Sequence, residues 1–447
     1  MQRREFIKAG ATLSMGAAVG GCISAGKSGN ALETPGNMEI RVNPVSGDKV
    51  SLLGFGCMRW PMIQKDGKEV IDQQAVNEMV DYALAHGVNY YDTSPVYLQG
   101  LSEAAAGEAL SRHPRESYYI ATKMSNFAVR TREASVKMYH DSMKALKTDY
   151  FDYYLLHSIG RGGAAAFNSR YVENGILDFL REEKAAGRIR NLGFSFHGSK
   201  ENFDYLISLH DSGEQIWDFC QIEMNYKDWR HADGVRNVNA EYLYAELDRR
   251  GIPIIIMEPL LGGRLARLPE GIAGRLKERE PDMSVASWAF RFCGTFPRVL
   301  CALSGMASMD PLVDNVRTFE HFKPLTREEL EFLEMMAVQM MEYPEVNCTD
   351  CKYCMPCPYG IDIPGIFKHY NESVTRGRYP QSREQEDYAR LKKAYLVGYD
   401  RAVPTLRQAD HCIQCGTCLP LCPQSINIPA QLRRIDTYIE KLKQDTL

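Results

Sequence analysis

The sequence lacks a large excess of charge of either sign, and it lacks a long hydrophobic run. Its 447 residues carry a formal net charge of −4, which argues against a nucleic-acid binder. Its weakly apolar N-terminal stretch, residues 9–19, is too short to cross a membrane as a helix. About 45% of the residues are hydrophobic, which is ample for a globular core, and the length predicts more than one domain.

A disulfide framework is not expected, although the chain has thirteen cysteines. Eight of them form two tight groups near the C-terminus, at spacings typical of metal ligands. Four others lie within or beside predicted strands and helices, where we expect small buried hydrophobes: Cys57, Cys220, Cys293 and Cys301.

Residues 1–38 are predicted to be a signal and a linker outside the fold. Arg3 and Arg4 resemble the pair of a twin-arginine export signal, and Val19–Cys22 resembles a lipoprotein cleavage box with Cys22 as the lipidated residue. A cytoplasmic tail with a chance arginine pair is the alternative. We expect export by the twin-arginine route, to the bacterial periplasm or to a lipid anchor at the membrane surface.

Within residues 39–325, predicted strands alternate with predicted helices, as in a barrel. A hairpin is expected at 39–49, followed by strands at 52–56, 88–92, 118–122, 151–156, 189–194, 217–222, 252–257 and 299–304. Helices are expected at 72–86, 102–112, 131–147, 171–186, 199–212, 238–250, 283–293 and 310–320. Eight repeats predict a closed (β/α)8 TIM barrel. Residues 326–447 are predicted to form a second, mostly helical domain, which begins with a helix at 326–342 leading away from the barrel.

Three consecutive predicted strands end on ionisable residues. These are Asp92, Lys123 and His157, and Tyr97 follows Asp92 after a turn. The C-terminal ends of barrel strands share one rim, where barrel enzymes build their active sites. A tyrosine there could protonate a carbonyl oxygen, with a lysine lowering its pKa, an aspartate fixing the lysine and a neutral histidine donating a hydrogen bond. The alternative is four ordinary residues at strand ends.

These residues stand in the motifs DTSPVY, ATK and LLH, and roughly residues 39–322 resemble the aldo-keto reductase family. Gly54–Arg59 and Gln221–Tyr226 resemble the family's first-strand and sixth-strand signatures. The resemblance implies a (β/α)8 barrel, a nicotinamide cofactor, and a small carbonyl or alcohol substrate. It also implies cofactor contacts at Ser195, Gln221, Met257, Ser304, Gly305 and Asn315.

The cofactor pocket departs from the family pattern. Phe196 follows Ser195 where the family often has asparagine, and Met257 stands where an aromatic residue usually stacks on the nicotinamide. The loop 303–311 has no basic residue for the 2′-phosphate of NADP, and nearby acidic residues would repel it. We therefore expect NAD(H) to bind at least as tightly as NADP(H), unless Arg264 reaches the phosphate from the neighbouring loop.

The two cysteine groups predict iron–sulfur clusters. Cys348, Cys351, Cys354 and Cys357 are spaced C-x2-C-x2-C-x2-C, and Cys412, Cys415, Cys418 and Cys422 are spaced C-x2-C-x2-C-x3-C. The second spacing is that of bacterial ferredoxins, in which the fourth cysteine of each run serves the other cluster. By that resemblance, one 4Fe-4S cluster takes Cys348, Cys351, Cys354 and Cys422, and the other takes Cys412, Cys415, Cys418 and Cys357. A pair of structural zinc sites is the alternative.

An internal repeat supports a helical ferredoxin-like module. Cys357–Pro364 is repeated as Cys422–Pro429, and in each copy an acidic or amide residue, Asp362 or Asn427, can cap a helix that begins at Ile-Pro.

Three functions are compatible with these motifs. The first is an exported oxidoreductase that interconverts a carbonyl and an alcohol, such as a sugar, while its clusters relay electrons to a redox partner protein or a quinone-linked acceptor. The second is an NAD(P)H-dependent carbonyl reductase with structural clusters, and the third is an electron-transfer protein with a non-catalytic barrel. The four residues Asp92, Tyr97, Lys123 and His157, called the tetrad below, are all present, which argues against the third function. The lack of basic residues for the 2′-phosphate argues against the second. The first function leaves one step open. A nicotinamide would pass two electrons together as a hydride, whereas each iron–sulfur cluster takes one electron at a time. The sequence shows no flavin motif that could convert between the two.

Overall fold

A computed structural model describes residues 37–160, 162–232 and 237–447. The residues on which export and lipid anchoring depend, Arg3, Arg4 and Cys22, lie outside this range, so both remain predictions. Among the described residues, no helix is both long enough and apolar enough to span a bilayer. Residues 35–447 form one compact unit.

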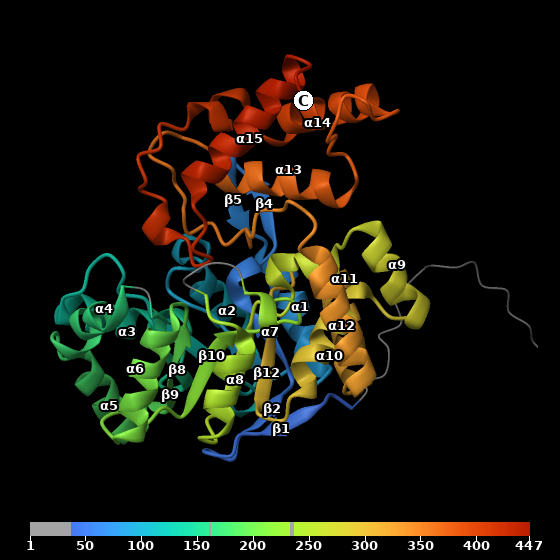
Figure 1. The fold of residues 1–447 in the computed structure, drawn as a ribbon. Helices are drawn as coiled ribbons and strands as arrows, with labels where there is room; N and C mark the ends of the chain where they lie inside the picture. The colour runs from blue at the N-terminus through green and yellow to red at the C-terminus, as the bar shows by residue number, and fades with distance from the viewer. Residues whose placement is uncertain (1–36, 161, 233–236) are drawn as a thin grey trace, which may run out of the picture. The chain divides into compact units, whose positions relative to one another are not determined.

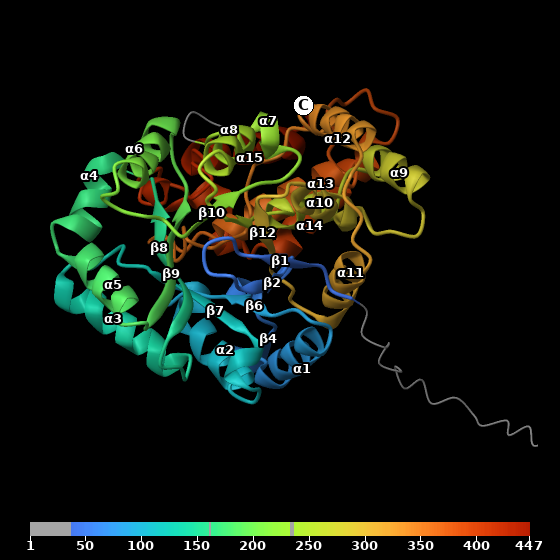
Figure 2. The ribbon, with the colours of Figure 1, turned by 90° about the horizontal axis from the view of Figure 1, so that it is seen from below.

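Eight parallel strands close into a barrel (Figure 2). In barrel order they are β10 (Phe219–Glu223), β11 (Ile254–Met257), β12 (Val299–Ser304), β3 (Leu53–Gly56), β6 (Tyr90–Asp92), β7 (Tyr119–Met124), β8 (Phe151–Ile159) and β9 (Ile189–Phe196). Strands such as β11 are apolar because helices cover their outer faces while side chains fill the interior. The predicted fold class is confirmed.

The helices that cover the barrel match the predicted ones within a few residues. They are α1 (Gln73–Ala85), α2 (Ser102–Leu110), α3 (Arg132–Ala145), α5 (Ile176–Ala185), α6 (Lys200–Asp211), α8 (Ala240–Asp248), α10 (Val285–Thr295) and α11 (Met309–Glu320). The N-terminal hairpin of β1 (Ile40–Val42) and β2 (Lys49–Ser51) is also present.

Several further elements were not predicted. They are the hairpin β4 (Met62–Lys65) and β5 (Lys68–Ile71), and the helices α4 (Gly163–Phe167), α7 (Asp228–His231) and α9 (Glu270–Arg279). The helix α12 (Arg327–Met340) buries Phe332, Leu333 and Met336 in the hydrophobic cluster of the barrel. It therefore packs on the barrel and does not lead away from it.

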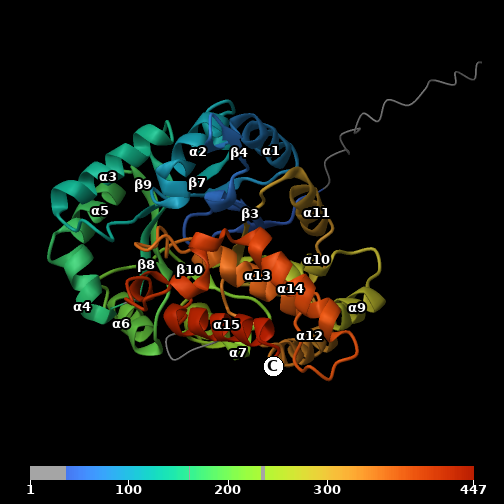
Figure 3. The same cartoon turned by 90° about the horizontal axis from the view of Figure 1, so that it is seen from above.

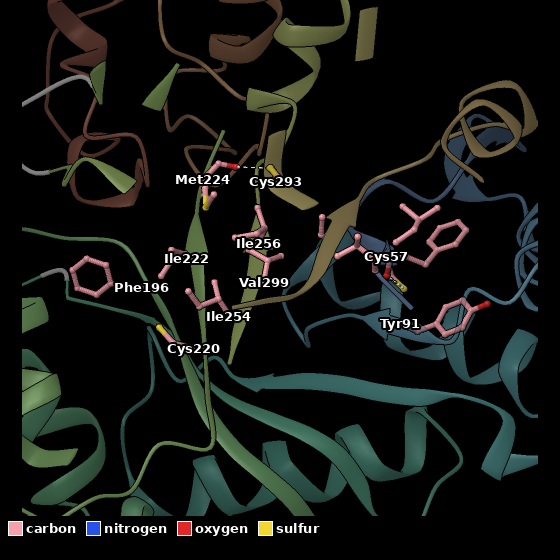
Figure 4. Packing of buried hydrophobic residues seen from close by; sticks show 14 of the residues in the cluster. Cys57, Tyr91, Phe196, Cys220, Ile222, Met224, Ile254, Ile256, Cys293 and Val299 are labelled. Carbon is pink, nitrogen blue, oxygen red and sulfur yellow. Dashed lines mark hydrogen bonds between the residues drawn. The ribbon is translucent and has the colours of Figure 1, made fainter. Parts of the chain in front are cut away.

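The barrel cysteines behave as small buried hydrophobes (Figure 4). Cys57, Cys220 and Cys293 lie in the apolar cluster that includes the barrel–helix interface, and Cys301 lies in a separate apolar cluster with Tyr90 and Tyr153. The Cys293 thiol donates a hydrogen bond to the Met224 carbonyl oxygen at 3.4 Å. Burial raises the pKa of all four thiols, which keeps them protonated.

The C-terminal domain is built on three helices, α13 (Ile363–Thr375), α14 (Tyr388–Ala402) and α15 (Ile428–Lys443), around a core of its own (Figures 1 and 3). The predicted caps are present. The Asp362 side chain accepts a hydrogen bond from the Gly365 amide, and the Asn427 side chain accepts one from the Ala430 amide. Each cap satisfies an amide that the first helical turn leaves unpaired.

Candidate active site and cluster sites

The four predicted catalytic residues come together at the C-terminal ends of neighbouring strands. Asp92 ends β6, Lys123 lies in β7 and His157 lies in β8, while Tyr97 opens the short helix η2 (Tyr97–Gly100). The Lys123 ammonium lies 4.7 Å from the centroid of the Tyr97 ring. The Tyr97 and His157 rings meet edge to face, with their centroids 5.9 Å apart.

A buried ion pair fixes the lysine. Lys123 Nζ donates to Asp92 Oδ1 at 2.5 Å and to the Thr93 carbonyl oxygen at 2.7 Å. Gln221 Nε2 donates to the other Asp92 oxygen at 3.3 Å. Burial raises the pKa of Asp92 and lowers the pKa of Lys123, and the opposite charge of each partner counteracts both shifts. Removing one partner would leave an unpaired buried charge.

His157 is held as a neutral imidazole. Its Nδ1 lies 2.5 Å from Ser125 Oγ and 3.3 Å from Ser94 Oγ. Burial lowers the pKa of His157, and the positive charges of Lys123 and Arg170 lower it further. A neutral imidazole with its proton on Nε2 can donate a hydrogen bond to a carbonyl oxygen, as the catalytic hypothesis requires.

Burial outweighs the expected effect of Lys123 on the pKa of Tyr97. We expected the ammonium to lower the pKa of Tyr97, but burial raises this pKa, and Tyr353 and Asp92 raise it further. Asp92 lies 2.5 Å from Lys123 and offsets its charge, so little of the ammonium's field is left to stabilise a phenolate. Tyr97 therefore stays protonated and can act as a proton donor.

A second tyrosine reaches the tetrad from the C-terminal domain. Tyr353 lies between Cys351 and Cys354, and its hydroxyl is 3.5 Å from His157 Nε2. Our reading of the sequence missed this residue, because an aromatic residue between two cysteines carries no signal for a contact 196 positions away.

Two of the predicted cofactor residues lie buried at the C-terminal ends of the barrel strands, and one of them keeps an unsatisfied polar group. Ser195 Oγ accepts a hydrogen bond from the Ser158 amide at 2.8 Å. Gln221 Oε1 is buried and has no hydrogen-bond partner in the part of the chain that the structure describes. An N–H or O–H group of a ligand would satisfy it.

The other residues predicted to contact a dinucleotide do not present free groups to one as they stand. Asn315 Nδ2 donates to Ser304 Oγ at 2.9 Å, so these two polar groups satisfy each other. Gly305 lies under the Arg59 side chain, and a Cβ at Gly305 would stand 3.0 Å from Arg59 Cδ. Met257, half-buried at the end of β11, offers no aromatic face. Arg264 hydrogen-bonds to the chain itself, at Glu345 and Asn347.

The eight C-terminal cysteines surround two cavities. The first cluster site is lined by Cys348, Cys351, Cys354 and Cys422. The second cluster site is lined by Cys357, Cys412, Cys415 and Cys418, and Cys354 also touches it. This division matches the exchange of fourth cysteines that the ferredoxin resemblance implies, so the residues present fit two 4Fe-4S clusters.

The loops around the two sites share an unusual backbone. Asp350 and Lys352 flank Cys351 with φ values of 54° and 63°, and Gln414 and Gly416 flank Cys415 with 59° and 76°. This left-handed conformation, uncommon for residues other than glycine, turns the chain sharply around each central cysteine. Among the described residues, no three Cys, His, Asp or Glu side chains are placed to hold one metal ion.

Comparison with protein-family models decides the family. The model of the aldo/keto reductase family matches residues 52–337, well over half of the chain. The chain belongs to the aldo/keto reductase family. A model of the 4Fe-4S dicluster domain matches residues 347–427. This aldo/keto reductase is therefore an oxidoreductase with an iron–sulfur domain.

Individual relatives cover mainly the barrel. The chain is 32% identical to Protein tas of Escherichia coli over 35% of this chain and 52% of the relative, so it spans about half of that relative's length. It is 24% identical to L-galactose dehydrogenase of Arabidopsis thaliana over 67% of this chain and 94% of the relative. A solved aldo-keto reductase from Klebsiella pneumoniae, in complex with NADPH, shares the fold with a TM-score of 0.52 and 21% identity, over 68% of this chain and 95% of that one.

The cluster assignment predicts metal content. Anaerobically purified protein should contain about eight iron and eight sulfide, with a broad absorbance near ~400 nm that bleaches on reduction. Cys422→Ser should remove a ligand of the first site and lower the iron content toward about four, whereas Cys293→Ser in the barrel should leave the iron content unchanged. Stoichiometric zinc without sulfide would contradict the assignment.

The protonated state of Tyr97 predicts a loss of rate. Tyr97→Phe removes the proton donor, so turnover should fall by ~10²–10⁴ while the iron content stays the same. Tyr359→Phe is a suitable control, because Tyr359 is exposed on the same domain as the clusters. Near-normal turnover of the Tyr97 variant would show that the proton comes from another group.

An acidic group at the domain contact predicts a dependence on pH. Glu223, at the end of β10, accepts a hydrogen bond from Gln424 Nε2 at 3.0 Å. Burial raises the pKa of Glu223, and the charges of Asp228 and Glu258 raise it further. The folded protein thus favours the protonated carboxyl, and its stability decreases as the pH rises through this raised pKa.

Glu223→Gln should therefore raise the thermal midpoint at about pH 8, and the gain should shrink toward about pH 5. Glu278→Gln, an exposed change in α9, serves as the control for lost surface charge. A gain that stays constant from pH 5 to 8 would show that ionisation of Glu223 is not its cause.

Proposed function

We propose that the protein is an exported oxidoreductase that interconverts a carbonyl and an alcohol at the barrel mouth, with its two clusters relaying the electrons. The observation that carries this proposal is the contact between Tyr353 and the tetrad. The loop that supplies Cys351 and Cys354 to the first cluster site also places a hydroxyl 3.5 Å from His157 Nε2. A cluster with only a structural role would not require its cysteine loop to contact the tetrad.

An alcohol becomes a carbonyl by losing its O–H proton, its C–H proton and two electrons. The O–H proton moves to Tyr97 as this tyrosine passes its own proton to water, and the C–H proton also goes to water. The eight cysteines would hold two 4Fe-4S clusters, which would supply one-electron chemistry at each site and so match the two electrons of one turnover. Tyr97 holds the proton that moves to or from the substrate oxygen, and His157 orients that oxygen. A redox partner protein or a quinone-linked acceptor takes up or supplies the electrons outside the protein.

The substrate is proposed to be a sugar or a related small polar molecule. The barrel mouth presents hydroxyl, imidazole and amide groups from Tyr97, Tyr353, His157 and Gln221, which suit a ligand with several hydroxyls. The name of the relative L-galactose dehydrogenase points to the same class. Export is proposed from Arg3 and Arg4, and a lipid anchor at Cys22 would keep the protein near membrane-bound acceptors.

An anaerobic experiment tests the proposed function. The as-isolated protein, with its clusters oxidised, is mixed with a panel of aldoses and small alcohols in the absence of any nicotinamide. We expect one class of alcohol to bleach the absorbance near ~400 nm by up to two electrons per protein and to yield the carbonyl product.

The controls separate substrate chemistry from nonspecific reduction. Tyr97→Phe should slow the bleaching by ~10²–10⁴ while a chemical reductant bleaches it normally, and Tyr359→Phe should behave as the wild type. Turnover that requires NADH or NADPH and leaves the clusters unchanged would instead establish a conventional reductase with structural clusters.

A further inference from the structure

The segment Glu345–Asp350 leads from the barrel into the first cysteine loop, includes Cys348 of the first cluster site, and contacts the rim of the barrel. It contacts η5 (Leu261–Ala266), which follows β11, and η1 (Cys57–Arg59), which follows β3. These are loops beside Met257 and Gly305, two of the residues that we expected to contact a dinucleotide.

Two arginines of the rim bind this segment. Arg264 Nε donates to Glu345 Oε2 at 2.9 Å, and Arg264 Nη1 donates to Asn347 Oδ1 at 2.7 Å. Arg59 Nη2 donates to the Thr349 carbonyl oxygen at 2.5 Å, and Arg59 Nη1 lies 3.8 Å from Asp350 Oδ2.

The packing leaves no gap between the segment and the loop after β11. Gly262 has a φ of 68°, and a Cβ at this position would stand 2.4 Å from Thr349 Cα. The Gly262 amide donates to Glu258 Oε2 at 2.5 Å, so it is not free to bind a phosphate.

The charges also oppose a dinucleotide here. The side chains of Arg264 and Glu345 are only 15% and 9% exposed, so water and salt screen their attraction weakly. The two phosphates of a dinucleotide would have to compete with Glu345 and Asp350 for the two guanidinium groups. Glu258, half-buried beside the same loop, adds a further acidic group.

We propose that the segment Glu345–Asp350 takes the place of a dinucleotide along this rim, so that the folded holoprotein binds neither NADH nor NADPH. The inference deepens the proposed function, because it leaves the clusters as the route for electrons. It rests on contacts of this chain and not on the identity of the substrate.

The first test is a binding titration. NADH and NADPH are each titrated into the anaerobic holoprotein to about 1 mM, and binding is followed by nucleotide fluorescence and by calorimetry. We expect no saturable binding of either nucleotide. Half-saturation below about 100 μM by either one would overturn the inference.

The second test asks whether Arg264 fixes the segment Glu345–Asp350 or binds a phosphate group of a nucleotide. In Arg264→Ala, hydrogen–deuterium exchange at residues 345–350 should increase by about tenfold or more, because the charge-assisted bonds to Glu345 and Asn347 are lost. Arg267→Ala is the matched control. It removes the same charge from the same loop, but Arg267 is 69% exposed and pairs only at 3.6 Å with Glu372.

Unchanged exchange in Arg264→Ala would show that the arginine does not fix the segment and would contradict the proposal. Nucleotide binding by the wild type that Arg264→Ala weakens would show that Arg264 is a phosphate ligand. Iron content, measured for each variant, shows that the clusters are retained. Failure of any alcohol to reduce the clusters would refute the proposed function but would leave the binding and exchange results unaffected.

Discussion

Arg59 and Arg264 hold the first cysteine loop against the barrel, and the arrangement of the mouth depends on this docking. Their guanidinium groups bond to Glu345, just before the first cysteine loop (Cys348–Cys357), and to Thr349, which lies between Cys348 and Cys351. With these residues fixed, the loop continues through Cys351 and places Tyr353 beside His157. The C-terminal domain thereby completes the site that the barrel strands begin.

Charge balance governs the chemistry that this mouth can support. The Lys123–Asp92 pair brings no net charge, His157 is kept neutral by burial, and Tyr97 is kept protonated. The site therefore offers hydrogen-bond donors to a substrate oxygen without a fixed net charge beside it. Burial also raises the pKa values of Glu223 and Glu258, so these two carboxyl groups likewise favour their neutral forms.

Much of this architecture could be predicted from the sequence because it follows from local patterns. Apolar runs separated by amphipathic stretches predict the barrel, and an ionisable residue at each of three strand ends predicts the convergence of Asp92, Lys123 and His157. The helix caps at Asp362 and Asn427 depend only on residues within one turn. The division of the cysteines followed from a known cluster-binding pattern.

What could not be predicted depends on contacts between distant parts of the chain. The Tyr97 pKa depends on how closely Asp92 approaches Lys123, and spacing in the sequence does not give that distance. Tyr353 and Arg264 meet partners from the other domain, 196 and 81 positions away, through pairs that no local pattern specifies. The helix α12 was misplaced because its amphipathic pattern shows that one face is buried but not which domain covers it.

The most direct test of the central claim is an anaerobic crystal structure of the holoprotein with iron located by anomalous scattering. We expect two separate four-iron peaks, at the first and second cluster sites. We also expect the Tyr353 hydroxyl to lie within hydrogen-bond reach of His157 in the barrel mouth, with Glu345 on Arg264. A structure with the first cysteine loop turned away from the barrel, or with a nucleotide seated between Arg59 and Arg264, would contradict the claim.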